Sequence, residues 1–135
     1  NSDTHGRIIN SMIHTFVEDN PSNTKAFTSM GQLNYLSTLQ FVDGVIGNSS
    51  SGLGEASTFK IGTINIGDRQ KGRLKADSVI DCSPDQQSIL RAIEKLYSID
   101  FQQKLVTVQS PYGDGHAAEK IHLDFIFHNI NSTLP

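Results

Sequence analysis

The fold is decided by residues 43–73, which read DGVIGNSSSGLGEASTFKIGTINIGDRQKGR. Short apolar runs bounded by glycines predict a strand over 42–47 and another over 62–66. Small turn-forming residues follow the first strand and lead into a helix expected over 52–60. The second strand runs into a polar loop with two arginines. This stretch therefore predicts strand, helix and strand in direct succession.

Helix and strand patterns also alternate in the rest of the chain. Apolar residues at helical spacing predict a first helix that begins after the capping residues 1–4 and stops near Pro21. Ser83 is the expected N-cap of a later helix, with Pro84 at its first position. Other helices are expected over 32–39, 84–98 and 116–127, helix or turn over 101–108, and strands over 25–30 and 78–81.

Strands separated by helices at this spacing predict an α/β fold with a parallel sheet of four strands and helices on both faces. No internal repeat or linker divides the chain, so one domain is expected over 1–128, followed by a loose tail over 129–135. Ligands of such open sheets bind beyond the carboxyl ends of the strands. The serine turn and the arginine loop each follow a strand, and we expect them to face one crevice.

Composition narrows the class of protein. The 135 residues are 36% hydrophobic and 19% charged, which is typical of an ordinary soluble domain. A net charge of -3 and the lack of a long apolar run argue against nucleic-acid and membrane partners. The single Cys82 is expected to be a small buried hydrophobe in a reducing compartment. Since the N-terminal residues do not resemble a signal peptide, we expect a cytoplasmic protein.

The serine turn is a candidate anion site. Ser49, Ser50, Ser51 and Gly52 are small residues at a helix start, where free N–H groups and the helix dipole favour an anion. Spacing alone supports a diphosphate cradle and a plain helix cap equally, because the turn is neither a Walker loop nor a GxGxxG fingerprint. Glu55, one turn later, could accept hydrogen bonds from both hydroxyls of a ribose or simply complement the dipole.

Other residues with possible binding roles lie outside this turn. Arg69 and Arg73 have forked donors that can neutralise phosphate charge, although charged loops are usually just solvated. Tyr35 could offer an aromatic face to a base or belong to a core. Three histidines spaced six apart on the last expected helix point in different directions, so we expect no metal site.

Taken together, these motifs resemble a known family. The run GNSSSGLGEASTFKIGTINIGDRQKGR, with NSDTHGRIIN before it and SPYGDGHAAEKI after it, is similar to the hydrolysing UDP-N-acetylglucosamine 2-epimerases of sialic acid biosynthesis. The serine triplet, the glutamate and NIGDRQ-G-R occur together and in order, and the resemblance covers nearly the whole chain. The resemblance implies that this chain is a Rossmann-like domain, namely the C-terminal half of a two-domain GT-B fold. It also implies that this domain is incomplete at its N-terminus.

The resemblance also implies site residues for a UDP-sugar. The second domain of the family holds UDP, and its contacts can be carried onto matching positions of this chain. Arg73 is a weaker candidate, because its loop could turn it away. The other implied contacts are Ser49 and Ser50 on the diphosphate, Glu55 on the ribose, Arg69 on the phosphates, Asn1 near the nucleotide and Tyr35 beside the uracil.

For the intact enzyme, the resemblance implies a homo-oligomer that needs no cofactor. It eliminates UDP across C1 and C2 of UDP-N-acetylglucosamine and adds water to give N-acetylmannosamine. The acid and base groups lie mainly in an N-terminal domain absent from this chain, so no catalytic residue is expected here and the isolated chain should be inactive. The alternatives are a hydrolysing UDP-N,N'-diacetylbacillosamine 2-epimerase of the legionaminic acid pathway, a UDP-sugar glycosyltransferase and a non-catalytic nucleotide-binding module. The joined GNSSSG and NIGDRQ motifs argue against the glycosyltransferase.

Overall fold

The computed structural model describes residues 6–131 of the chain, with side chains described for residues 6–124. The chain divides into two compact units, residues 1–35 and residues 36–135. The second unit contains the three strands of the described part. The single domain expected over 1–128 stays a prediction.

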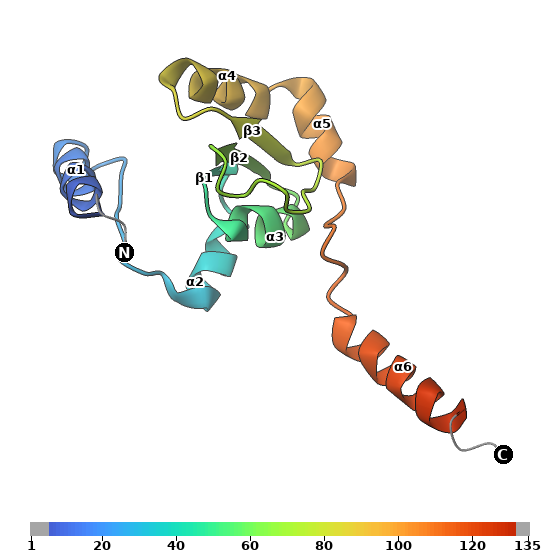
Figure 1. Cartoon of the computed structure of the whole chain (residues 1–135). Helices are drawn as coiled ribbons and strands as arrows, with labels where there is room; N and C mark the ends of the chain where they lie inside the picture. The colour runs from blue at the N-terminus through green and yellow to red at the C-terminus, as the bar shows by residue number, and fades with distance from the viewer. Residues whose placement is uncertain (1–5, 132–135) are drawn as a thin grey trace. The chain divides into compact units, whose positions relative to one another are not determined.

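The first unit contains helix α1 (Gly6–Asp19), which ends just before Pro21 as the sequence predicts (Figure 1). The backbone N–H of Asn20 closes the helix by donating to the carbonyl oxygen of Phe16 at 3.1 Å. The strand predicted over 25–30 is wrong, because these residues form a loop. A strand needs a neighbour for its backbone hydrogen bonds, and the described residues of this unit include no other strand.

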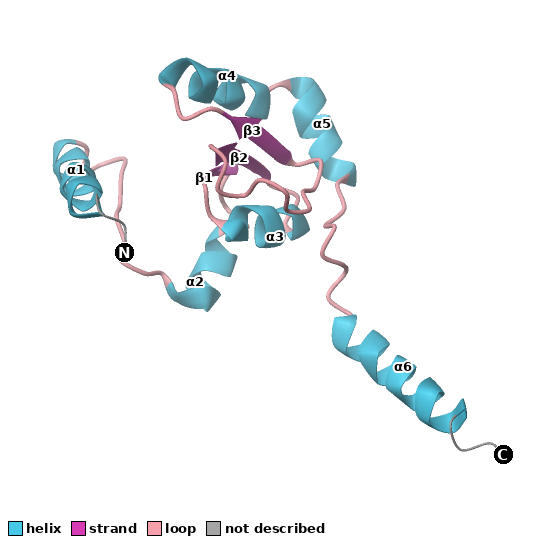
Figure 2. Ribbon diagram, in the orientation of Figure 1, coloured by secondary structure: helices cyan, strands magenta, loops and turns pink. Residues whose placement is uncertain are grey.

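The second unit is built on a parallel sheet (Figure 2). Ile64 on the central strand is in register with Ile46 on one side and Ile80 on the other. The predicted parallel sheet is therefore confirmed, with three described strands in place of four. Across the sheet the strands are β1 (Gly44–Gly47), β2 (Gly62–Ile66) and β3 (Val79–Cys82).

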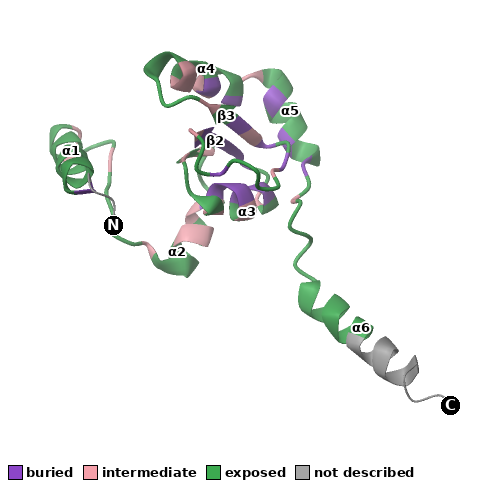
Figure 3. Cartoon of the chain, viewed as in Figure 1, coloured by how far each residue is buried: buried purple, intermediate pink, exposed green. Residues whose placement is uncertain are grey.

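Helices cover both faces of this sheet, as predicted (Figure 1). On one face lies α3 (Ser50–Thr58), where the hydroxyl of Thr63 donates to the carbonyl oxygen of Gly52 at 2.7 Å. Side chains alternate along a strand, so Ile64 points to the opposite face, which is covered by α4 (Gln86–Leu96). The buried core on that face consists of Ile64, Ile80, Ala92, Leu96, Phe101 and Leu105 (Figure 3).

Two paired glycines allow α4 to approach the sheet closely. Gly44 of β1 and Gly62 of β2 lie opposite each other in register. A β-carbon added to Gly62 would lie 2.2 Å from Leu96 Cδ1, and one added to Gly44 would lie 2.7 Å from Leu96 Cδ2. Non-bonded carbon atoms prefer a separation of about 3.5 to 4.0 Å. The missing side chains therefore create the space that Leu96 fills.

Helix α4 begins at a different residue from the predicted one. Its N-cap is Asp85, whose carboxylate accepts a hydrogen bond from the backbone N–H of Ser88 at 2.9 Å. The predictions of Ser83 as N-cap and Pro84 as the first helical residue are therefore wrong. Aspartate caps a helix as well as serine does, and a carboxylate adds a favourable interaction with the helix dipole.

The remaining predicted helices are present, with shifted ends. The segment predicted as helix or turn over 101–108 is a helix capped by Ser98. Residues 129–131, expected in a loose tail, continue the last helix, and residues 132–135 lie outside the described part. No helix of the described part is both long and apolar enough to cross a membrane. These helices are α2 (Gly31–Thr38), α5 (Ile99–Thr107) and α6 (Ala117–Asn131).

Candidate functional site

The serine turn joins the end of β1 to the start of α3. Ser49 is the N-cap of the helix, with extended backbone angles of φ -81° and ψ 147°. Its hydroxyl accepts a hydrogen bond from the backbone N–H of Ser51 at 3.4 Å and lies 3.0 Å from the Ser51 hydroxyl. Ser49 and Ser50 are exposed. The helix-cap interpretation is thus confirmed, and the cap leaves the positive end of α3 facing solvent.

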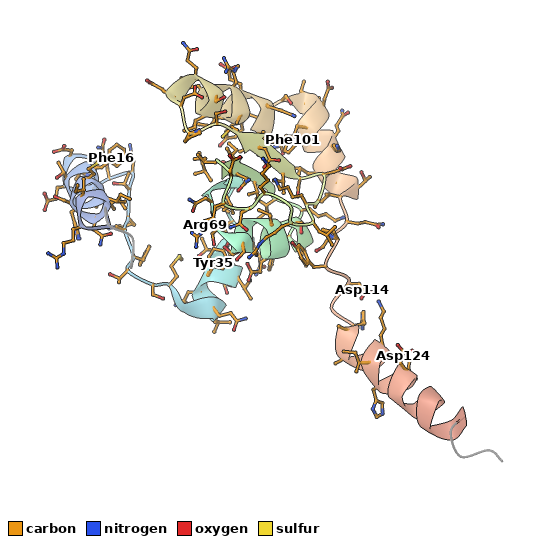
Figure 4. All side chains as sticks on the ribbon, viewed as in Figure 1. Phe16, Tyr35, Arg69, Phe101, Asp114 and Asp124 are labelled. Atoms are coloured by element: carbon orange, nitrogen blue, oxygen red, sulfur yellow. The ribbon has the colours of Figure 1, made fainter. Side chains whose placement is uncertain are left out.

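The arginine loop after β2 meets the serine turn at Asn48. Arg69 Nη1 lies 3.4 Å from Asn48 Oδ1, and Gln70 Nε2 donates to the Asn48 carbonyl oxygen at 2.7 Å. Arg69 is labelled in Figure 4. Both loops follow adjacent strands, so they share the carboxyl edge of the sheet. The two loops therefore lie side by side, but their residues line different hollows and Arg69 lines neither, so the shared crevice stays a prediction.

A hollow of about 390 Å³ opens beside the first turns of α3. Glu55 is exposed on the helix and lines this hollow. The opposite wall is the loop over 110–115, held in place by the Tyr112 hydroxyl, which donates to the Leu74 carbonyl oxygen at 2.8 Å. The hollow offers hydroxyl, carboxylate and backbone groups, which suit a polar ligand. Its lining residues from α3 are Ser50, Ser51, Gly54, Glu55 and Thr58.

The other predicted site residues are placed less directly. Gly52 is buried in α3, where its carbonyl oxygen accepts from Thr63. Arg73 is exposed and is not among the residues that line the hollow. Tyr35 is half-buried in the first unit, so its relation to the crevice stays a prediction. Asn1 lies outside the described residues.

A second hollow of about 520 Å³ lies at the end of β3. Partial burial raises the pKa of Asp81, but hydrogen bonds from Lys75 and Asn65 outweigh burial and leave the pKa below its ordinary value. Burial, with Asp85 and Asp81 nearby, raises the pKa of the Cys82 thiol. A protonated thiol is a poor nucleophile and a poor metal ligand. Cys82 is half-buried and packs against the core, close to its predicted role.

The part of the chain that the structure describes contains no group of three histidine, cysteine, aspartate or glutamate side chains suited to a metal ion. The described groups near the start of α3 are hydrogen-bond donors and two exposed carboxylates, Glu55 and Asp114, which line the hollow. Such groups can bind and orient an anionic, hydroxyl-bearing molecule.

Sequence reasoning missed two parts of this site. The sequence pattern gives no role to Asn48 and Gln70, yet they join the two loops. It predicts no binding role for the loop over 110–115, although this loop forms a wall of the hollow. Its segment SPYGDGHAAEKI did carry part of the family resemblance, and that was the available signal.

The chain is also similar in sequence to known proteins. The family model described as UDP-N-acetylglucosamine 2-epimerase matches residues 1–124. The chain belongs to this family. The match covers most of the chain, including the serine turn, the arginine loop and the loop over 110–115.

Three curated relatives support the same family. The chain is 41% identical over 103 residues to "GDP/UDP-N,N'-diacetylbacillosamine 2-epimerase (hydrolyzing)" of Campylobacter jejuni, 76% of this chain and 26% of the relative. It is 36% identical over 129 residues to "Polysialic acid biosynthesis protein P7" of Escherichia coli, a match that covers 93% of this chain and 32% of the relative. It is 30% identical over 122 residues to "UDP-N,N'-diacetylbacillosamine 2-epimerase (hydrolyzing)" of Legionella pneumophila, a match that covers 90% of this chain and 31% of the relative. The chain thus spans about a quarter to a third of the length of these relatives.

Proposed function

We propose that this chain is the UDP-binding part of a hydrolysing UDP-N-acetylglucosamine 2-epimerase. The observation that carries the proposal is the junction at Asn48, which brings the serine turn and the arginine loop together beside the hollow that Glu55 lines. The family model agrees with this substrate class. The intact enzyme would also contain an N-terminal catalytic domain and would assemble as a homo-oligomer.

Each contact with UDP follows from the chemistry of the crevice. The diphosphate would bind at the start of α3, near Ser49 and Ser50, where N–H groups and the helix dipole favour negative charge. Arg69 would add a charged, forked donor from the neighbouring loop. Glu55 would accept hydrogen bonds from the ribose hydroxyls in the adjoining hollow. The proposed contact of Tyr35 with the uracil rests on the family resemblance alone.

In the proposed reaction, these residues stabilise the leaving group. When the bond between C1 of the sugar and the UDP oxygen breaks, negative charge accumulates on the β-phosphate. Donors already oriented toward that charge stabilise the transition state more than the ground state. Loss of the C2 proton completes elimination to a 2-acetamidoglucal, and addition of water gives N-acetylmannosamine. The groups that move these protons would belong to the N-terminal domain, so the isolated chain should bind UDP without turning over substrate.

The proposal is tested by titrating UDP into the ¹⁵N-labelled chain and following backbone amide signals. We expect shifts at 49–52, at Glu55 and at Arg69. Separate titrations with pyrophosphate and with uridine should each shift a different set of amide signals. Pyrophosphate should shift the signals of the serine turn, and uridine should shift the signal of Glu55. Unchanged amides at 49–52 in saturating UDP would remove the proposed site.

Arg69 gives the kinetic prediction for the intact enzyme. The substitution Arg69→Ala should lower turnover at least tenfold, since loss of one donor to a developing charge typically costs on the order of 3 kcal/mol. Arg91→Ala is the matched control, because Arg91 is an exposed arginine of α4 with a long 3.5 Å contact to Ser88. Steady-state release of UDP measures both variants. Equal rates for Arg69→Ala and the unaltered enzyme would show that Arg69 faces solvent during the reaction.

A second candidate reaction is favoured by the names of two relatives. The proteins of Campylobacter jejuni and Legionella pneumophila are named as hydrolysing 2-epimerases of UDP-N,N'-diacetylbacillosamine. The sugar would be recognised largely outside this chain, so the same crevice serves either donor. Assaying the intact enzyme on both UDP-sugars separates the candidates, because the true substrate should have the higher kcat/KM.

A further inference from the structure

Gln70 is unusual among the residues of the arginine loop. Its neighbours Arg69 and Lys71 are exposed, whereas Gln70 is only 3% exposed. Glutamine is seldom fully buried unless its amide is hydrogen-bonded, since removing an unpaired amide from water is costly. The burial of this one side chain therefore needs a structural reason.

One end of the amide is paired: Gln70 Oε1 is buried without a hydrogen-bond partner among the described residues, whereas Gln70 Nε2 contacts the serine turn. Gln70 Nε2 donates to the backbone carbonyl oxygen of Asn48 at 2.7 Å, across 22 residues of sequence. The orientation of the amide is fixed by chemistry, because an oxygen in place of Nε2 would face another acceptor and could not donate. Asn48 lies between Gly47, where β1 ends, and Ser49, the N-cap of α3. Gln70 thus holds the backbone immediately before the helix start.

The geometry points to Gln70 as a positioning residue that fixes the serine turn relative to Arg69 before a ligand arrives. This inference rests on the proposed UDP site. Gln70 acts through Asn48 and needs no contact with the nucleotide. A turn already held in its binding geometry loses less conformational freedom when the diphosphate binds, and prearranged donors are the ones that stabilise developing charge.

The central test is Gln70→Met, which keeps the length and volume of the side chain but removes the donor. UDP binding, measured by calorimetry on the full chain, should weaken about tenfold, as expected for loss of one hydrogen bond that holds the turn. The matched control is Gln102→Met on α5, where Gln102 Nε2 donates to the Leu96 carbonyl oxygen at 2.6 Å. The control should change the melting temperature without changing the affinity for UDP.

A second variant separates positioning from general stability. In Gln70→Glu the substituted carboxylate cannot donate to Asn48 at neutral pH, but its protonated form can. The affinity for UDP relative to the unaltered chain should therefore recover as the pH falls from about 7.5 to about 5, since burial raises the pKa of a carboxyl group into this range. Gln70→Met should show no such recovery.

A measurement without ligand keeps this inference distinct from the proposed function. Backbone ¹⁵N order parameters at 49–51 should fall in Gln70→Met and stay unchanged in Gln102→Met. If the unaltered chain binds no UDP, the proposed function fails, and the order parameters alone decide the role of Gln70. Unchanged order parameters in Gln70→Met, or UDP affinity equal to that of the unaltered chain, would overturn the positioning role.

Discussion

Helices α3 and α4 both begin beyond the carboxyl edge of the same sheet, but they are capped by different chemistry. At α3 the cap is the neutral hydroxyl of Ser49, which accepts from the backbone N–H of Ser51. At α4 the cap is the carboxylate of Asp85, which accepts from the backbone N–H of Ser88. Each cap satisfies a backbone donor, so the two are similar for helix stability.

The two caps differ in the charge that they leave at the helix start. The carboxylate of Asp85 already supplies the negative charge that the dipole of α4 favours. The hydroxyl of Ser49 supplies none, and Arg69 adds positive charge from the neighbouring loop. The cap charges alone therefore favour the start of α3, the proposed anion site, over the start of α4 for a phosphate. The comparison teaches that two helix starts at one sheet edge can be equally well capped and still differ in charge.

Placing a charged cap at the start of α3 should have the largest effect, a loss of affinity for UDP. Ser49→Asp keeps an N-cap acceptor but places a carboxylate where the diphosphate is proposed to bind. We expect UDP affinity to fall more than tenfold, because like charges in a partly desolvated site repel by at least about 1.4 kcal/mol. Calorimetric titration of UDP measures the loss, and circular dichroism should show unchanged helix content.

The control for this exchange is Ser49→Asn, which keeps a capping oxygen without adding charge. It should retain most of the affinity for UDP. If Ser49→Asp also retained it, the diphosphate would bind elsewhere and the comparison between the two helix starts would lose its functional meaning.

Removing the cap of α4 should have a smaller effect, on the stability of the fold rather than on the affinity for UDP. Asp85→Ala leaves the backbone N–H of Ser88 without its side-chain acceptor and should lower the free energy of unfolding by about 1 kcal/mol. Denaturant titration measures this loss, and Asp85→Ser should restore most of it. UDP affinity should stay unchanged, since α4 is not part of the proposed site. A weaker affinity in Asp85→Ala would mean that the two helix starts are coupled.

The smallest effect is expected at Asp114, a carboxylate in the loop before α6. Hydrogen bonds from Lys120 and from the backbone N–H of His116 lower the pKa of Asp114 to about 2. Because this pKa is below the ordinary value of 3.8, the contribution to stability is complete above about pH 4 and is lost as the pH falls through 2. Carboxyl ¹³C titration should give this pKa.

Lys120→Ala is the matching change, and it should move the pKa of Asp114 back toward 3.8. An unshifted pKa in that variant would show that the hydrogen bond from His116 is sufficient. UDP affinity near neutral pH should not respond, because the carboxylate is ionised there in both proteins.

Local patterns predicted much of the fold. The apolar run of β2 between two glycines predicted both ends of that strand, and apolar residues at helical spacing predicted α1, whose expected capping residues 1–4 lie outside the described part. The segment 25–30 has a strand-like pattern but lies in a loop, because strand formation depends on a neighbour rather than on the segment itself. The cap at Asp85 was missed because Ser83 is an equally good capping residue and the sequence does not choose between them.

The sequence predicted only those residues of the candidate site that belong to one motif. Ser49, Glu55 and Arg69 belong to one continuous motif, so the sequence alone suggested them together. Gln70 binds a backbone carbonyl, and Tyr112 binds the carbonyl oxygen of Leu74 from 38 residues away. Backbone acceptors are present at every residue and leave no trace in the sequence, so such contacts appear only once the chain is folded.

The paired glycines of β1 and β2 have a consequence for how this family can vary. Leu96 occupies the space that side chains at 44 and 62 would need. The three positions therefore share one fixed volume, and a change at one restricts the others. Relatives with alanine or a larger residue at 44 or 62 should carry a smaller residue than leucine at 96, so these positions should covary during evolution.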